Sequence, residues 1–122
     1  MGADIFIIKV NKKELQEKLK DHDVRELTGD EIEAIKEDEI TSFINVFERY
    51  FEKNEISYEI GSYHEITITE FESMIRFLER RLSLACDKTD WNFRMAAMIY
   101  DKMKEWKEGL NGSSLLFRQE KA

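Results

Sequence analysis

The sequence contains no proline, one cysteine and five glycines among its 122 residues. The single cysteine, Cys86, excludes an internal disulfide framework, and we expect it to be a small core residue near the end of a helix. No apolar run approaches the roughly 18 residues that a membrane-spanning helix needs. The short apolar stretch at 5–10 follows an aspartate rather than lysines, so it does not resemble a signal peptide. From these absences we expect a cytoplasmic protein that contacts no membrane.

Motifs with readable chemistry are also absent. The sequence has no phosphate-binding glycine loop, no nucleophile elbow, no paired C-x-x-C and no H-x-x-x-H helix. The loop that begins at Asp21 has Arg25 in its fifth position and Ile32 in its twelfth, where a calcium-binding EF-hand needs an oxygen ligand and a glutamate. A looser divalent site around Asp21, His22 and Asp23 stays open as an alternative. We expect no metal ion and no cofactor.

The chain is acidic, and its excess of negative charge lies in one segment. The net charge is −7, and residues 21–40 hold nine acidic and two basic residues, which accounts for all of it. A general nucleic-acid binder would need a basic stripe, so we expect no direct binding of nucleic acid. Thr28 and Glu31 form a T-x-x-E capping box, which predicts that the acidic stretch opens as a helix.

The acidic stretch has two interpretations, a solvated helix surface or a docking face. We favour a docking face for a basic protein surface, for example that of a nucleic-acid-binding protein, because the whole net charge is gathered in one place. The expected contact residues are Asp30, Glu31, Glu33, Glu37, Asp38 and Glu39.

Hydrophobic periodicity predicts an α+β fold in a single domain, 1–122. We expect a small, mostly antiparallel sheet, made of an N-terminal strand and a central hairpin, packed on one face by four to five helices. Residues 110–122 form a flexible or edge-strand tail. The expected elements are a strand at 4–10, a short helix at 12–20, a helix at 28–53 that breaks near 36–39, a hairpin at 55–69, a helix capped by Thr69 and Glu72, and a last helix from Trp91 to Gly109, whose apolar face includes Trp91 and Met98.

Other side chains leave alternatives open. Tyr63, Trp106 and Phe117 have no evident place in the core, so a self-associating regulatory or structural subunit, such as a homodimer, is one alternative. A small enzyme that uses His64 and nearby carboxylates is another, although a surface pair of His64 with Glu59 across the hairpin is the ordinary reading.

A basic cluster at Arg76, Arg80 and Arg81 would suit a phosphate or an acidic peptide. Against that use, Glu72 and Glu79 on the same expected helix favour a salt-bridged helix surface instead.

The first six residues, MGADIF, resemble the start of small phage and bacterial proteins. The general type, small, acidic, cysteine-poor and without motifs, is similar to phage-encoded inhibitors of bacterial defence systems (anti-CRISPR-like proteins) and to toxin-immunity proteins. This resemblance of type implies a non-catalytic protein that inhibits a partner by binding it.

Overall fold

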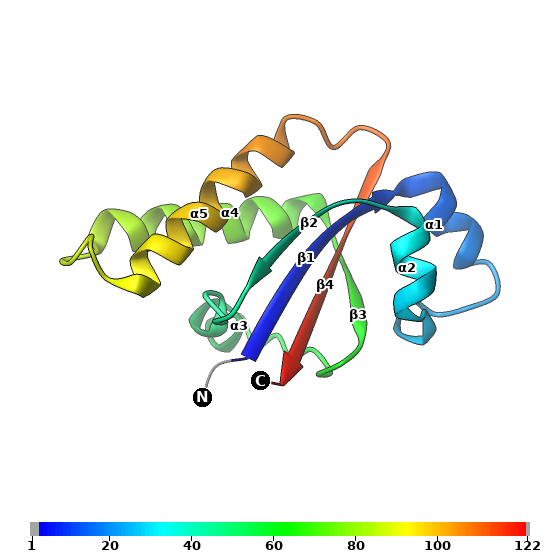
Figure 1. Cartoon of the computed structure of the whole chain (residues 1–122), viewed down its shortest axis with the longest axis horizontal. Helices are drawn as coiled ribbons and strands as arrows, with labels where there is room; N and C mark the ends of the chain where they lie inside the picture. The colour runs from blue at the N-terminus through cyan, green and yellow to red at the C-terminus, as the bar shows by residue number, and fades with distance from the viewer. Residues whose placement is uncertain (1–2, 122) are drawn as a thin grey trace.

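The computed structural model describes residues 3–121, and its fold is α+β (Figure 1). Four strands form one antiparallel sheet in the order β2-β1-β4-β3. Within the described residues five α-helices accompany the sheet, and α4 and α5 form a helical hairpin. The elements are β1 Ala3–Asn11, α1 Lys12–Lys18, the 3-10 helix η1 Val24–Glu26, α2 Gly29–Ile35, β2 Lys36–Ser42, α3 Glu48–Lys53, β3 Tyr63–Ile66, α4 Ile68–Leu84, α5 Trp91–Lys107 and β4 Ser113–Lys121.

Strand β1 is buried on both faces, as its nearly continuous apolar sequence predicts. Ile5 and Ile7 belong to the larger core, together with residues of α3, α4 and α5. Ile8 and Val10 belong to a second core, together with residues of α1 and α2. Helices therefore cover both faces of the sheet (Figure 1), and the prediction that they pack on one face is wrong.

The acidic stretch is a short helix followed by a strand. Helix α2 begins as predicted, since Thr28 Oγ1 accepts a hydrogen bond from the Glu31 N–H at 3.2 Å and the Glu31 carboxylate accepts one from the Thr28 N–H at 3.0 Å. At Lys36 the chain turns into β2, an edge strand that pairs with β1. Ile40 and Ser42 alternate into the core there, while an edge strand tolerates the charges before them. The break near 36–39 exists, but a helix across 36–47 is wrong.

The hairpin predicted at 55–69 does not form. Only Tyr63–Ile66 is a strand in this segment, and its partner is β4. Ile56 and Tyr58 still pack against the larger core, so their alternation reports burial without a strand. The N–H of Gly61, at a positive φ of 87°, donates to the carbonyl of Gln119 at 2.8 Å and docks this loop on β4.

The C-terminal segment lies inside the sheet. β4 pairs with β1 on one side and with β3 on the other, so the expected flexible or edge-strand tail is wrong. Leu115 and Phe117 enter the larger core and Leu116 enters the smaller one. Three consecutive apolar side chains can thus all be buried, because the strand has a core on each face.

The two long helices are capped by side chains. The Thr67 hydroxyl accepts from the Glu70 N–H at 3.1 Å, so the N-cap of α4 lies two residues before the expected cap at Thr69. Asp90 caps α5 through the Asn92 N–H at 3.0 Å, where the sequence predicts a start.

Several expectations about burial are wrong. Trp91 and Met98 are exposed rather than in the core, at 61% and 68%. Cys86 is exposed as well. The three aromatic side chains that suggested self-association are buried, and they are Tyr63, Trp106 and Phe117.

Candidate functional site

The six acidic residues expected to dock a partner divide between two elements. Asp30, Glu31 and Glu33 lie on α2, and the other three lie on β2. Lys36 stands between the two groups, because its Nζ lies 2.9 Å from Glu33 and 3.8 Å from Glu39. The hydrogen bond to Glu33 raises the pKa of Lys36, and the charge of Glu39 adds to that effect against the cost of desolvation.

Asp38 is tied to the fold. Its carboxylate accepts a hydrogen bond from the indole Nε1 of Trp106 at 3.0 Å, and the Lys102 ammonium lies 3.4 Å away. Burial opposes ionisation of this carboxyl, but the hydrogen bonds from the Glu39 N–H and Trp106, with the charge of Lys102, outweigh it and lower the pKa of Asp38. Asp38 therefore connects β2 to α5 while it stays charged.

The other acidic side chains have weaker ties. Glu31 completes the cap of α2, and its hydrogen bond from the Thr28 N–H lowers its pKa. Glu37 is exposed and accepts a hydrogen bond from the Ser113 hydroxyl. Asp30 and Glu33 are exposed on α2. The acidic surface is thus partly committed to internal contacts.

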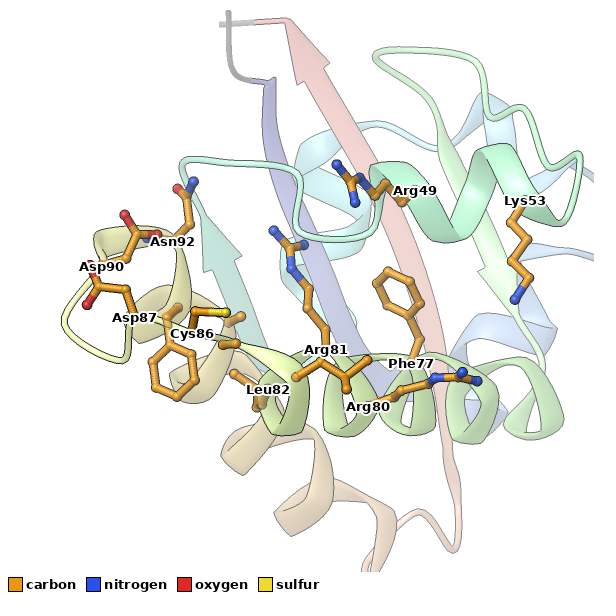
Figure 2. Close-up of a pocket in the computed structure, with 14 residues that line it drawn as sticks. Arg49, Lys53, Phe77, Arg80, Arg81, Leu82, Cys86, Asp87, Asp90 and Asn92 are labelled. Atoms are coloured by element: carbon orange, nitrogen blue, oxygen red, sulfur yellow. The ribbon is translucent and has the colours of Figure 1, made fainter.

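A groove of about 610 Å³ lies elsewhere, between α3 and α4, and reaches the turn before α5 (Figure 2). Arg49 and Lys53 project from α3, one helical turn apart, and Arg80 and Arg81 project from α4. Phe77 stands between the two helices, where its ring packs 5.6 Å from that of Tyr50. Four cations thus surround an aromatic side chain.

Most of these cations have no anionic partner in the part of the chain that the structure describes. Within residues 3–121, no carboxylate oxygen lies within 4.0 Å of Arg49, Lys53 or Arg80. Arg81 is also without a carboxylate there, but its guanidinium donates to the Val46 carbonyl at 2.9 Å and so anchors the loop before α3.

The expected salt-bridged surface around the arginines of α4 is wrong. Glu72 pairs with Lys107 at 3.4 Å, and Glu79 accepts a hydrogen bond from the Tyr100 hydroxyl. Both acids therefore turn to α5, which leaves Arg80 to the groove. Arg76 is exposed and does not line it.

The far end of the groove is acidic and apolar. Asp87 and Asp90 lie in the turn between α4 and α5, and the side chains of Leu84 and Phe93 line the groove beside them. Leu84 is 70% exposed, which leaves a large apolar side chain in water. This combination suits a ligand that has both charged and apolar parts.

His64 lies in a smaller cleft on the sheet edge. Its ring stacks on Tyr58 at 4.6 Å, and its Nε2 lies 3.1 Å from the backbone carbonyl of Glu59, not its carboxylate. The Tyr58 hydroxyl donates to Glu70 at 2.6 Å, and burial together with that hydrogen bond raises the pKa of the phenol. The role of His64 in an enzyme stays a prediction.

The alternative of a divalent site around Asp21, His22 and Asp23 finds no support in geometry. Across residues 3–121 no group of three or more histidine, cysteine, aspartate or glutamate side chains is placed to hold a metal ion. Asp23 instead caps η1 through the Arg25 N–H at 2.9 Å, and the backbone and side-chain hydrogen bonds from Arg25 lower its pKa. In the same described range, no helix has the length and apolar character needed to cross a membrane.

The sequence pointed to only part of the groove. The basic cluster expected from the sequence includes Arg80 and Arg81 but not Arg49 and Lys53. Their signal was present, because two cations four residues apart lie on one side of a helix. Comparisons of the chain with protein-family models, with curated proteins and with solved structures found no match.

Proposed function

We propose that this chain is a non-catalytic protein-binding module and that its binding site is the groove between α3 and α4. The occupant is a segment of a partner protein that carries carboxylates and large apolar side chains. One observation carries the proposal: Arg49, Lys53 and Arg80 border an apolar floor and have no carboxylate within 4.0 Å in residues 3–121. Arginine in a groove of this kind is ready to receive carboxylates.

A protein segment fits this groove better than nucleic acid does. The net charge of −7 repels a polyanion, and the cations form one small cluster rather than a stripe. Phe77, Leu84 and Phe93 line the groove, and their apolar side chains pack favourably against apolar groups, which a phosphate backbone does not provide. Exposed apolar surface rimmed by polar groups is typical of protein interaction sites.

A designed peptide tests the proposal. The probe is a fluorescent peptide of about ten residues, ~33 Å when extended, that contains glutamates, leucines and a phenylalanine. We expect the parent protein to bind it, and we expect the double variant Arg49→Glu, Arg80→Glu to bind at least about tenfold more weakly, equivalent to ~1.4 kcal/mol. Arg81 is left in place, because it holds the Val46 carbonyl.

The matched control is Lys12→Glu, Lys13→Glu, which makes the same change in net charge on exposed residues of α1. Equal weakening by both double variants would overturn the groove as the site, since it would report only the overall charge. Displacement of the peptide by a single-stranded oligonucleotide at equal concentration would favour nucleic acid as the occupant instead.

The acidic surface supports a second candidate, docking of a basic partner protein as the sequence suggested. Asp30, Glu33 and Glu37 are exposed and able to steer such a partner. The test is the reversal of these three residues to lysine. Asp38 is kept, because it binds Trp106. Association of the triple variant with a lysine-rich peptide should slow at low salt by about one to three orders of magnitude, and an unchanged rate would remove this candidate.

An inhibitor of a bacterial defence protein, or an immunity-like factor, is one biological use of such a module, and the resemblance of type supports it. The cytoplasm is the proposed location, because the chain has a single cysteine, Cys86. Self-association loses its original argument, since Tyr63, Trp106 and Phe117 are buried.

A further inference from the structure

The groove carries opposite charges at its two ends. Lys53 and Arg80 lie towards one end, and Asp87 and Asp90 lie in the turn at the other end, as Figure 2 shows. Residues 80 and 87 are seven positions apart, of which four lie in α4, at ~1.5 Å each, and three follow its end at Leu84, at no more than ~3.3 Å each, so their Cα atoms are at most ~16 Å apart. The groove also has an apolar lining, which consists of Phe77, Leu82, Leu84, Ala85, Phe93 and Ala96.

The carboxylates of the turn are held in place by hydrogen bonds. Asp87 accepts hydrogen bonds from the N–H and the hydroxyl of Thr89, at 2.9 Å and 2.6 Å, and these bonds lower its pKa. Asp90 accepts from the Asn92 N–H as the cap of α5. Within residues 3–121 no lysine, arginine or histidine nitrogen lies within 4.0 Å of either carboxylate.

We propose that the groove binds its partner segment preferentially in one of the two possible directions. The acidic end of the segment lies against Arg49, Lys53 and Arg80, a basic residue lies against Asp87 and Asp90, and large apolar side chains fill the space between them. This inference rests on the proposed function. Reversal of the segment would bring like charges together at both ends, which costs affinity and selects one arrangement.

The length of the groove sets the spacing in the partner. A separation of at most ~16 Å is covered by up to about five extended residues, at ~3.3 Å each, or by up to about eleven helical residues, at ~1.5 Å each. The partner segment should therefore carry its basic residue within that distance of its nearest acidic residue. A segment of this kind is amphipathic and has opposite charges at its two ends.

Cys86 is a built-in reporter for this arrangement. It is the only cysteine of the chain, it is exposed, and it lines the groove next to Asp87. Two peptides of identical sequence, with glutamates at one end, leucine and phenylalanine in the middle and lysine at the other end, carry a bromoacetamide group at either the basic or the acidic end. The thiolate of Cys86 displaces bromide and forms a thioether, so no oxidant is needed.

We expect the peptide with the reactive group at its basic end to label Cys86 at least about tenfold faster than the other peptide, as measured by mass spectrometry. The swapped variant Arg80→Glu, Asp87→Lys should lose this preference or invert it. Asp90 is not changed in this test, because it caps α5. Circular dichroism checks that the variant folds.

The outcomes separate the two proposals. If both peptides bind the parent protein and label Cys86 equally fast, the direction is not read, although the groove remains a binding site. If neither peptide binds the parent protein, the proposed function fails and this inference fails with it. If the swapped variant keeps the parent's preference, charge does not set the direction and the inference is overturned.

Discussion

The acidic stretch at 21–40 and the groove between α3 and α4 are both charged, but their charges are bonded differently. In the acidic stretch, Glu31 caps a helix and Asp38 holds an indole N–H and a lysine. In the groove, Arg49, Lys53 and Arg80 lie beyond 4.0 Å from every carboxylate in residues 3–121. Clustered charge is therefore a weaker sign of a binding site than charge without an internal partner.

The difference follows from the places that the two regions occupy in the fold. β2 is an edge strand, and charged side chains on an edge strand discourage pairing with another chain. Its acidic residues have this use even without a partner protein. Among the groove cations, Arg81 donates to the Val46 carbonyl and Lys53 lies in the last turn of α3, where the helix dipole favours a cation. Arg49 and Arg80 have no comparable contact within residues 3–121.

The largest effect on stability is expected at Asp38, and it tests whether the acidic stretch serves the fold. Asp38→Lys leaves the Trp106 N–H without its acceptor, and it places a third cation near Lys102 and near Lys9, which faces position 38 across the sheet. A buried donor left unsatisfied costs about 1–3 kcal/mol, so we expect a loss of ~2 kcal/mol or more in the free energy of unfolding.

Urea unfolding measures this loss, with Asp30→Lys as the control. Asp30 is exposed, and its substitution makes the same change in charge, so its effect should stay within about 0.5 kcal/mol. Equal losses in the two variants would show that the acidic stretch acts on stability through its overall charge alone.

A smaller effect is expected from acid. Because the folded state lowers the pKa of Asp38, this carboxylate stabilises the protein above its unfolded pKa, and the contribution is lost as the pH falls through the lower, folded pKa. In Asp38→Asn that loss is absent, so the stability of the variant should fall less between neutral and strongly acidic pH than that of the parent. The carboxylate is 39% exposed, which keeps the difference small. Parallel slopes in the two proteins would contradict the prediction.

The smallest effect is expected in the groove. Arg49→Glu and Arg80→Glu should each change the free energy of unfolding by no more than about 0.5 kcal/mol, because both side chains are exposed and neither has a carboxylate within 4.0 Å in residues 3–121. Thermal unfolding of each variant measures this. A loss as large as that of Asp38→Lys would mean that the groove cations serve the fold, and any weaker peptide binding would then have to be attributed to instability.

Local signals in the sequence predicted local structure well. The capping box at Thr28 and Glu31 and the doubly buried β1 are both confirmed. Each of these depends on residues within about one turn or one strand. The α+β class followed from the same signals.

Features that depend on distant residues were missed. The hairpin predicted at 55–69 does not form, because the one strand of this segment pairs with β4, some fifty residues later, and not with a second strand beside it in sequence. The basic cluster of α4 was predicted to be a salt-bridged surface because Glu72 and Glu79 lie beside its arginines in sequence, whereas the partners of these two acids, Lys107 and Tyr100, come from α5. Sequence spacing along one helix cannot report which neighbour a second helix will supply.

The position of β4 has a consequence for how the chain is made. The two central strands of the sheet, β1 and β4, come from opposite ends of the described chain, and their pairing joins residues such as Ile5 and Gln119. On the ribosome, the hairpin of α4 and α5 can close on itself through local contacts before β4 has emerged. β1 can pair with β2 and pack on α1 and α2 early, but its second edge has to wait for β4. A nascent chain therefore carries an apolar strand with one unpaired edge until residues 113–121 arrive.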